Sequence, residues 1–366
     1  MEDLLVYKDN CFEIKSFYGN YKVEFIDNPF FVLETLAQKN IFFIIDENVF
    51  KIYSKEFKFF QNSENYLLIN PTEEAKSLDK FPKYIEECIS KNLKRGQTVI
   101  AIGGGIIQDI CGFLCSILFR GLDWIFFPTT LLAQADSCIG SKTSINVNNV
   151  KNLVGNFYPP KHIYISHIFL NTLEEIEINS GIGEIIKVHA IFGQEEFNLL
   201  KHDYYSLARN SEILTKYIRK SLLLKKKIIE EDEFDKSSRL VLNYGHSFGH
   251  AIESATNYKV PHGVAVAIGC HLANYISKCL DFNDGKVFLN MSGILRQNFK
   301  NACLINFDLD KFFVSLKKDK KNSMDFLNLI LPNELGFPSV TKVENSAFFK
   351  NACLAFFTNE LGFNFK

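Results

Sequence analysis

Residues 239–263 read RLVLNYGHSFGHAIESATNYKVPHG and carry three of the chain's eight histidines. His246 and His250 are spaced i, i+4, which places both imidazoles on one face of a helix. His262 follows in a Pro-His-Gly turn. Imidazole is the commonest neutral ligand of zinc-like metals. A lone HxxxH pair more often belongs to an ordinary helix with surface or core histidines, so the prediction of a metal site depends on its surroundings.

Two further polar residues precede the histidines. Asn243 and Arg239 lie one and two helical turns upstream of the pair. If the helix is continuous, all four polar side chains share one face of an otherwise apolar segment. Such a face is typical of the floor of a binding site, so we expect a metal and its ligand here.

The composition is that of an ordinary globular protein. The chain has 366 residues, 47% of them hydrophobic and 23% charged, and this length favours two domains. The net charge of −1 gives no reason to expect nucleic acid or an anionic membrane as a partner. Nine cysteines without a CxxC pair indicate reduced thiols. We therefore expect a cytoplasmic protein.

Neither the N-terminus nor the most apolar segment predicts a membrane protein. The N-terminal sequence MEDLLVYKDN is acidic and lacks the apolar core of a signal peptide. Residues 105–119 form the most apolar region, but Asp109 interrupts it and Arg120 follows it. The segment is too short and too polar to cross a bilayer, so it predicts a buried helix.

The first half of the chain alternates strand-like and helix-like patterns. Apolar runs with strand character occur at NIFFIIDENV (40–49), ENYLLIN (64–70), TVIAIGGG (98–105) and DWIFFPTT (123–130). Continuous apolar strands between helices predict a parallel sheet covered on both faces. After about residue 170 the strand-like runs end and long helical patterns follow. We expect a Rossmann-like α/β dinucleotide-binding domain over residues 1–170 and a mostly α-helical, metal- and substrate-binding domain over residues 171–366.

Three glycines follow the third of these strands and open a helix. Without Cβ atoms, Gly103, Gly104 and Gly105 would let backbone amides approach a phosphate at the helix N-terminus. Thr129 and Thr130 add hydroxyl donors after the next strand, at the edge of the sheet where ligands bind. A tight turn without a ligand explains the glycines equally well.

Other polar residues of the first half have both functional and ordinary interpretations. Asp46 ends a strand, where it would bind a ribose hydroxyl or cap a helix. Asp136, Lys142, Lys151 and Asn152 lie among turn formers between residues 127 and 160, a segment that we expect to be a loop. The loop is either solvated or part of the cofactor site.

A carboxylate and an amine stand further along, in SGIGEIIK. Glu184 and Lys187 are spaced i, i+3 on a predicted helix. The pair is either an ordinary surface ion pair or a metal ligand beside a phosphate-binding amine.

A series of motifs occurs in a fixed order between Asp46 and Pro332. They are EEAKSL, GGGIIQDICGF, FRG, PTTLLAQADS, GSKTSINVNNVKNLVGNFYPP, SGIGEIIK, LKKKIIEEDE, RLVLNYGHSFGHAIE, HGVAVAIG and DKK. In this order the chain resembles the sugar phosphate cyclases, and among them the 3-dehydroquinate synthases. The resemblance implies a zinc (or cobalt) site of Glu184, His246 and His262, with His250 facing the substrate instead of the metal.

The resemblance also implies sites for NAD and for a sugar acid phosphate. NAD would contact Asp46, Glu73, Lys76, Gly104, Gly105, Asp109, Thr129 and Thr130, with Asp136, Lys142 and Lys151 nearby. The substrate's carboxylate and phosphate would be held by Lys142, Asn152, Lys187, Lys225, Arg239, Asn243 and Lys320 or Lys321. Arg120 would reach the phosphate site of a neighbouring subunit, which implies a homodimer.

The implied activity is a phosphate-eliminating cyclisation in the shikimate pathway. The substrate would be 3-deoxy-D-arabino-heptulosonate 7-phosphate and the products 3-dehydroquinate and phosphate, formed by transient oxidation, elimination, reduction and aldol closure. Two alternatives stay open: a sister cyclase that makes another carbocycle, and a metal-dependent alcohol dehydrogenase.

The sequence departs from the family pattern at five positions without losing an implied site residue. Thr72, Gln108 and Ser141 stand where glycine is usual, Gly183 stands where alanine is common, and Asp325 replaces a glycine after DKK. These departures bear on the shape of the loops that would hold the cofactor and the substrate.

Overall fold

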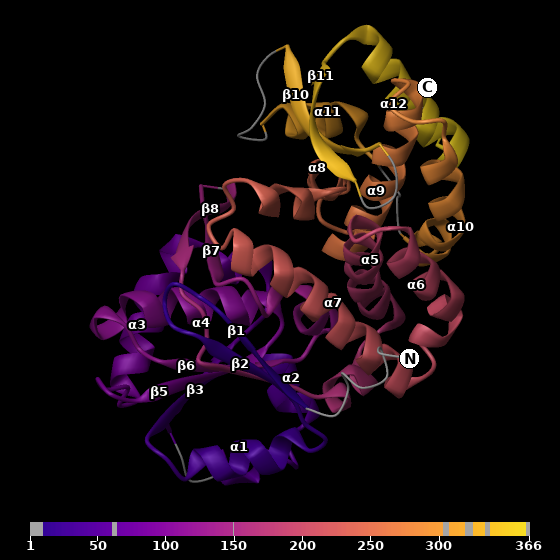
Figure 1. The fold of residues 1–366 in the computed structure, drawn as a ribbon. Coiled ribbons are helices and arrows are strands. Elements are labelled where there is room, and N and C mark those ends of the chain that lie inside the picture. Colours follow the sequence, from indigo (N-terminus) through magenta and orange to yellow (C-terminus); the bar gives the residue numbers. More distant parts are fainter. Residues whose placement is uncertain are drawn as a thin grey trace. The chain divides into compact units, whose positions relative to one another are not determined.

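The protein is described by a computed structural model that covers residues 10–60, 64–148, 150–302, 307–318, 325–333 and 337–363. The chain divides into two compact units, Met1–Leu173 and Glu174–Lys366. The division falls close to the expected boundary after residue 170. Figure 1 shows the elements of both units.

The first unit contains a mostly parallel sheet. Its described strands lie in the order β1-β2-β9-β6-β5-β3-β4, and every neighbouring pair is parallel except β1 and β2. The strands are β1 (Cys11–Ile14), β2 (Tyr21–Phe25), β3 (Ile41–Asp46), β4 (Tyr66–Ile69), β5 (Thr98–Gly103), β6 (Trp124–Pro128) and β9 (His162–Ile165). The four predicted strands are β3 to β6, so the parallel sheet is confirmed. The remaining three strands were not predicted.

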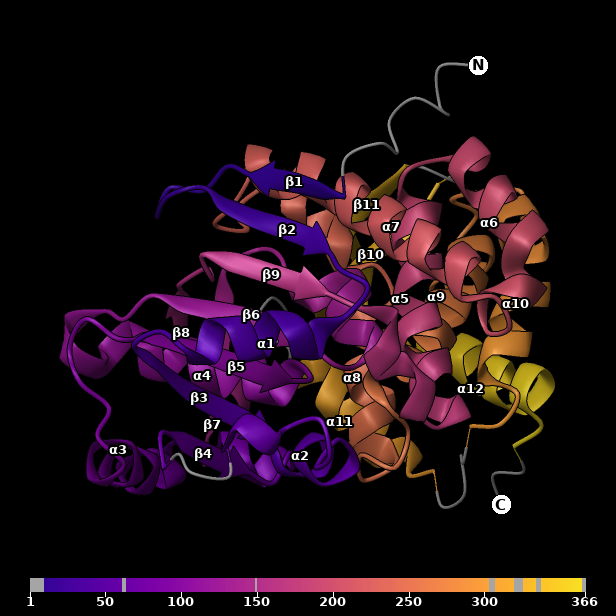
Figure 2. The same ribbon diagram turned by 90° about the horizontal axis from the view of Figure 1, so that it is seen from below.

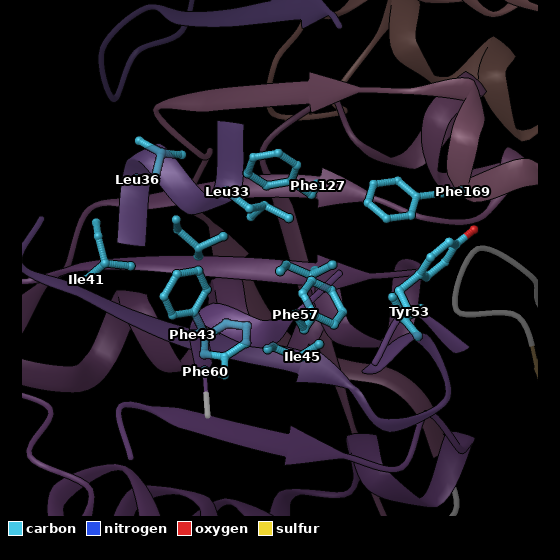
Figure 3. Close-up of a cluster of buried hydrophobic side chains, with 13 residues drawn as sticks. Leu33, Leu36, Ile41, Phe43, Ile45, Tyr53, Phe57, Phe60, Phe127 and Phe169 are labelled. Atoms are coloured by element: carbon cyan, nitrogen blue, oxygen red, sulfur yellow. The ribbon is translucent and has the colours of Figure 1, made fainter. Parts of the chain in front are cut away.

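The strand β3 shows why the sheet lies inside the unit. All six residues of IFFIID are buried, as expected of a strand covered on both faces. Phe43 and Ile45 point to one face, where they pack with Leu33 and Leu36 of helix α1 (Pro29–Ala37), as Figure 3 shows. Asn28 caps this helix by accepting hydrogen bonds from the amides of two of its residues.

The opposite face of the sheet is covered by α4 (Gly105–Ile117), the buried helix predicted from its apolar sequence. It packs on β5, β6 and β3 and buries Ile107, Ile110 and Leu114. Figure 1 shows α1 and α4 on opposite sides of the strands. The unit's other α-helices are α2 (Glu47–Ile52) and α3 (Phe81–Ser90).

The expectation that residues 127–160 form a loop is wrong. It contains a π-helix, Ala133–Ser137, and an antiparallel hairpin of β7 (Lys142–Val147) and β8 (Val150–Phe157). A Cβ on Gly155 would lie 1.9 Å from the carbonyl oxygen of Thr143, so the pairing of the two strands needs a glycine at this position. The glycine that we interpreted as a turn former therefore allows strand pairing.

The second unit is mostly helical. Its α-helices are α5 (Glu175–Ile191), α6 (Gln194–Leu207), α7 (Ser211–Glu231), α8 (His246–Ala255), α9 (His262–Cys279), α10 (Lys286–Phe299), α11 (Leu309–Lys318) and α12 (Ala347–Leu361). The central helix is α9, which packs against α5, α8, α10 and α12 (Figure 2). Nearly all of α9 is buried, as expected of a helix that is apolar on every side.

The prediction that strands end after residue 170 is wrong at one place. The strands β10 (Phe326–Pro332) and β11 (Pro338–Glu344) form an antiparallel hairpin in the second unit. The apolar sequence FLNLILP buries most of β10, which packs on α9. Among the described residues, no helix is both long enough and apolar enough to span a membrane.

Candidate metal and substrate site

Glu184, His246 and His262 meet in the second unit. Glu184 lies in the middle of α5, while His246 and His262 are the first residues of α8 and α9. The Glu184 Oε1 atom is 3.7 Å from His246 Nε2 and 3.4 Å from His262 Nε2. The ligand atoms of the three residues all lie within 4.8 Å of one another. Two imidazoles and one carboxylate at this spacing match the donor set of a catalytic zinc site.

Two glycines allow the helices to approach each other at this point. A Cβ on Gly183 would lie 2.2 Å from the carbonyl oxygen of Gly263, and a Cβ on Gly263 would lie 1.8 Å from the carbonyl oxygen of Ser180. The Ser180 hydroxyl accepts a hydrogen bond from the Gly263 amide at 3.0 Å. Each glycine directly adjoins one of the clustered residues, so the close backbone contact brings Glu184 and His262 together.

The Glu184 carboxylate is a buried anion with free acceptor capacity. Its side chain is 1% exposed, and neither oxygen accepts a hydrogen bond of good geometry from a described residue. Lys187 Nζ lies 2.6 Å from Oε2. Burial alone would raise the pKa of Glu184, but Lys187 and the two histidines hold it well below its usual value. An ionised carboxylate that is buried beside two imidazoles fits a cation, so the residues present suit a divalent metal.

The two histidines differ in their protonation. Burial and the Lys187 ammonium lower the pKa of His246 well below its usual value, which keeps the imidazole neutral and able to bind a metal. Burial would also lower the pKa of His262, but Glu253 and Glu184 together raise it to about 10. One ring nitrogen of His262 therefore faces Glu253, and the other faces Glu184.

His250 lies beside this group. It is exposed on α8, and its ring centroid is 5.6 Å from those of both His246 and His262. Together with Glu253 and His262 it forms a second set of close donor atoms. The helix α8 thus carries both members of the HxxxH pair on one face, as the spacing predicted.

The expectation of one continuous helix from Arg239 to His250 is wrong. Residues Ser238–Asn243 form a 3-10 helix, and α8 begins only at His246. Gly245 separates the two helices with a φ of 78°, a left-handed conformation that favours glycine. A Cβ on Gly245 would meet Cys270 Sγ at 2.5 Å. Arg239 and Asn243 therefore do not share a helical face with the histidines.

Arg239 is held by a loop that Asp232 organises. The Asp232 carboxylate accepts hydrogen bonds from the amides of Lys236, Ser237 and Arg239. Burial would raise the pKa of Asp232, but these amide donors lower it to about 2. The Arg239 guanidinium is buried and donates to the carbonyl oxygen of Glu233. Asp232 was not predicted as a site residue, although it lies within the LKKKIIEEDE motif.

The remaining candidate residues of the second unit are two buried lysines and the DKK motif. Lys187 and Lys225 are 2% and 6% exposed, from α5 and α7. The Lys187 ammonium lies 2.6 Å from the Glu184 carboxylate, so an ion pair is buried at this position. Lys320 and Lys321 lie outside the described residues.

Several predicted residues of the first unit form one polar network. The Lys76 ammonium is buried and lies 2.7 Å from Asp109 Oδ2, 3.9 Å from Glu73 Oε1 and 3.0 Å from Asn152 Oδ1, to which it donates a hydrogen bond. Lys151 lies 3.8 Å from Glu73 Oε2. The structure thus brings together five residues that the sequence places in three separate segments.

Asn146 completes this network and was missed. Its side-chain amide donates to Glu73 Oε1 at 2.8 Å, and its Oδ1 accepts from the Asn152 amide at 2.9 Å. Ser144 adds a hydroxyl that donates to Asn152 Oδ1 at 2.8 Å. Both residues lie in the polar part of β7, where a loop interpretation gave them no partner.

The glycine turn after β5 is tight for reasons of packing. A Cβ on Gly103 would lie 2.4 Å from Ile107 Cγ1, and one on Gly104 would lie 2.8 Å from Thr130 Cγ2. Gly104 also precedes the first turn of α4, whose amides are the expected phosphate donors. Packing in a tight turn is therefore enough to explain these glycines. The turn also leaves the N-terminus of α4 without a side-chain cap.

The other predicted residues of the first unit lie in several different elements. Asp46 caps α2 by accepting from the amides of Asn48 and Val49. Lys142 is exposed at the start of β7, and Asp136 lies in the π-helix. Arg120 is exposed with a φ of 67°. Gly105 is the first residue of α4, and Thr129 follows the last residue of β6.

Comparison with known proteins decides the family. Residues 66–180 match the family described as 3-dehydroquinate synthase N-terminal, and residues 181–322 match 3-dehydroquinate synthase C-terminal. The chain belongs to the 3-dehydroquinate synthase family. A 3-dehydroquinate synthase of Dictyoglomus thermophilum is 39% identical over 306 residues, which are 83% of this chain and 85% of the relative. One of Alkaliphilus metalliredigens is 38% identical over 302 residues, 81% and 84% of the two chains.

The fold is shared with a solved structure of another enzyme. A crystal structure of 2-deoxy-scyllo-inosose synthase, complexed with carbaglucose-6-phosphate, NAD+ and Co2+, matches with a TM-score of 0.82. The match covers 94% of this chain and 99% of that chain at 23% identity. This likeness is one of fold.

Two departures from the 3-dehydroquinate synthase pattern have a structural explanation. Gln108 donates to the Ser137 carbonyl oxygen at 2.6 Å and accepts from its hydroxyl at 2.7 Å, which ties α4 to the π-helix. Gly183 is required by the contact with Gly263. Ser141 adopts a φ of 67°, a conformation that the usual glycine would reach at lower cost.

Proposed function

We propose that this chain is a 3-dehydroquinate synthase that converts 3-deoxy-D-arabino-heptulosonate 7-phosphate into 3-dehydroquinate and phosphate, a step of the shikimate pathway. The observation that supports this most strongly is the convergence of Glu184, His246 and His262 beside the buried Lys187, in a chain of this family. The reaction is a carbon–oxygen lyase reaction, because the C–O bond to phosphate breaks without hydrolysis.

We assign zinc or cobalt to Glu184, His246 and His262, and NAD to the first unit. The cofactor residues would be Asp46, Glu73, Lys76, Gly104, Gly105, Asp109, Thr129, Thr130, Asp136, Lys142 and Lys151. When bound, NAD would accept one hydride and return it, while the metal would polarise a substrate oxygen as a Lewis acid. The neutral His246 and the ionised Glu184 suit the metal, and the buried Lys76–Asp109 pair gives the cofactor residues a fixed arrangement.

The chain's own residues would hold a substrate with two anionic groups. We assign Lys142, Asn152, Lys187, Lys225, Arg239, Asn243 and His250 to it, and we keep Lys320 or Lys321 as a prediction. The Arg239 guanidinium is always charged and presents a fixed fork that suits a carboxylate. The lysines suit the phosphate dianion, which they would stabilise as it leaves. A sister cyclase that acts on a sugar phosphate without a carboxylate has no use for Arg239.

The test is to incubate the purified protein with the heptulosonate phosphate, NAD+ and zinc. We expect one phosphate released for each 3-dehydroquinate formed, measured by a phosphate assay and mass spectrometry, with no accumulation of NADH absorbance. Steady NADH formation with a neutral polyol would instead identify an alcohol dehydrogenase. Phosphate release with a different carbocycle would identify a sister cyclase.

We also propose a homodimer in which Arg120 completes the phosphate site of the neighbouring subunit. The exposure of Arg120 supports this proposal. Arg120→Ala and Lys187→Ala should each be inactive, while a mixture of the two unfolded and refolded together should recover activity in mixed dimers. A mixture that stays inactive, or a chain that sediments as a monomer, would count against the homodimer.

A further inference from the structure

Glu253 lies on the far side of His262 from the proposed metal ligands. Its side chain is 9% exposed, and its Oε2 atom is 3.2 Å from His262 Nδ1. The other nitrogen of the same ring, Nε2, is 3.4 Å from Glu184 Oε1. The imidazole of His262 is therefore held between two carboxylates, one at each nitrogen.

The helix α8 fixes the position of Glu253. His246, His250 and Glu253 are spaced i, i+4 and i+7, so they share one face of this helix. The helix packs against α9, whose first residue is His262. The Glu253 carbonyl oxygen accepts from the Tyr258 amide at 2.7 Å and from the Thr256 hydroxyl, which closes the end of α8. One helix thus supplies a proposed ligand and a carboxylate that contacts another.

We infer that Glu253 is a positioning residue that orients His262 for the metal. By accepting a hydrogen bond from Nδ1–H, the carboxylate selects the tautomer that leaves the Nε2 lone pair for the ion. It also fixes the rotation of the ring and increases its basicity. Partners of this kind typically contribute a factor of about 10 to 100 to metal affinity. The inference rests on the proposed metal site and adds a residue that does not itself bind the ion.

The chain offers a matched control for this pair. His271 Nε2 lies 3.4 Å from Glu360 Oε2, so a buried histidine faces a carboxylate elsewhere in the second unit. His271 and Glu360 belong to α9 and α12, and neither residue is in the groups of close metal-ligating atoms found among the described residues. Glu360→Gln removes a carboxylate charge that faces a histidine and also pairs with Arg296, without touching His262.

The experiment measures zinc affinity of the metal-free full-length chain by competition with a chromogenic chelator. Glu253→Gln should weaken binding by about 10- to 100-fold, with one ion still bound per chain, and should alter the absorption spectrum of the cobalt-loaded protein. Glu360→Gln should leave both unchanged. In a His262→Ala background, Glu253→Gln should have little further effect, within about twofold, because the carboxylate acts through that ring. Glu253→Asp serves if Glu253→Gln does not fold.

Three other outcomes would overturn the inference. Unchanged zinc affinity in Glu253→Gln would overturn the inference while leaving the proposed function intact. Two ions per wild-type chain, falling to one in Glu253→Gln, would make Glu253 a ligand of a second ion and would also overturn it. A wild-type chain that binds no divalent metal would overturn the proposed metal site together with the inference.

Discussion

Single residues show how burial controls protonation in the second unit. His271 is fully buried in α9, where it stacks on Phe288 with ring centroids 4.8 Å apart. Burial lowers its pKa to about 4, although Glu360 opposes the shift and the nearby Arg296 adds to it. The imidazole is therefore neutral in the folded protein at neutral pH, and folding at lower pH requires it to lose a proton.

We expect this residue to make the protein less stable in mild acid. The folded-state pKa of about 4 lies below the usual 6.5, so the unfolded chain binds more protons between these values. Stability should fall with decreasing pH in this window, by at most about 1.4 kcal/mol per pH unit from this group. Urea unfolding of the wild type and His271→Leu at about pH 7 and pH 5 should show a smaller pH dependence in the variant. Equal pH dependence would contradict the assignment.

Arg239 gives a prediction about the substrate. Removing one partner of a charge-assisted pair typically costs a few kcal/mol, so Arg239→Ala should lower turnover of the acid substrate by about 10² to 10³. Zinc and NAD binding should persist, because a guanidinium has no lone pair for a metal and Arg239 lies in the other unit from the proposed NAD residues. The control is Arg209→Ala, which removes an exposed arginine. Full activity in Arg239→Ala would exclude a role in binding the carboxylate.

At the scale of residues, the sequence indicated which side chains to propose for the site. It gave much less information on the contacts that these side chains make. The spacing of His246 and His250 was sufficient to place them on one helical face. The carboxylate of Glu184 was singled out from its local pairing with Lys187, but its meeting with the histidines followed only from the family resemblance. Asn146 was not predicted because an asparagine in a polar run gives no indication of a partner such as Glu73, which is far away in the sequence.

At the scale of elements, the contact between α5 and α9 brings the proposed ligands together. The contact depends on Gly183 and Gly263, which leave no room for a Cβ. Gly293 in α10 is different, because a Cβ there would meet nothing within 4 Å. The two kinds of helical glycine should therefore respond oppositely to alanine.

We expect Gly183→Ala to separate the helices and to cost roughly 1–3 kcal/mol of stability, as overpacking commonly does. Zinc affinity should fall in the same variant, since Glu184 moves with its helix. Gly293→Ala should stabilise the chain by about 0.4–1 kcal/mol through the entropy of the unfolded state. Urea midpoints and zinc titrations test both. If Gly183→Ala matched Gly293→Ala in stability, the close contact would not constrain the site.

Element boundaries were predicted where the local pattern is strong and missed where tertiary contacts decide. The continuous apolar runs of β3 to β6 and the long helices α5, α7 and α9 were evident. The end of the 3-10 helix was not, because a glycine within a helical pattern is often tolerated. Gly245 breaks that pattern where its backbone lies against Cys270, a neighbour that is distant in the sequence. The hairpin of β7 and β8 was obscured by glycines and polar residues that also occur in loops.

For the whole molecule, metal binding should be coupled to stability. A ligand that binds only the folded chain stabilises it by about 2.7 kcal/mol at a concentration 100 times its Kd. Zinc at saturation should therefore raise the urea midpoint of the wild type, and removal by a chelator should lower it together with activity. Glu184→Gln should show neither response to zinc, because its buried carboxylate is lost. A wild-type midpoint that does not depend on zinc would contradict the metal site.

The position of the three proposed ligands along the chain has a consequence for the order of folding. His246 and His262 begin consecutive helices that pack against each other, so their contact closes only a short loop. Glu184 belongs to α5, from which α6, α7 and the 3-10 helix separate the histidines. Closing that longer loop has a greater entropic cost and tends to be slower. During refolding, the chain should therefore pass through forms that offer an ion two nitrogens before the carboxylate arrives, and tight zinc retention should mark the docking of α5.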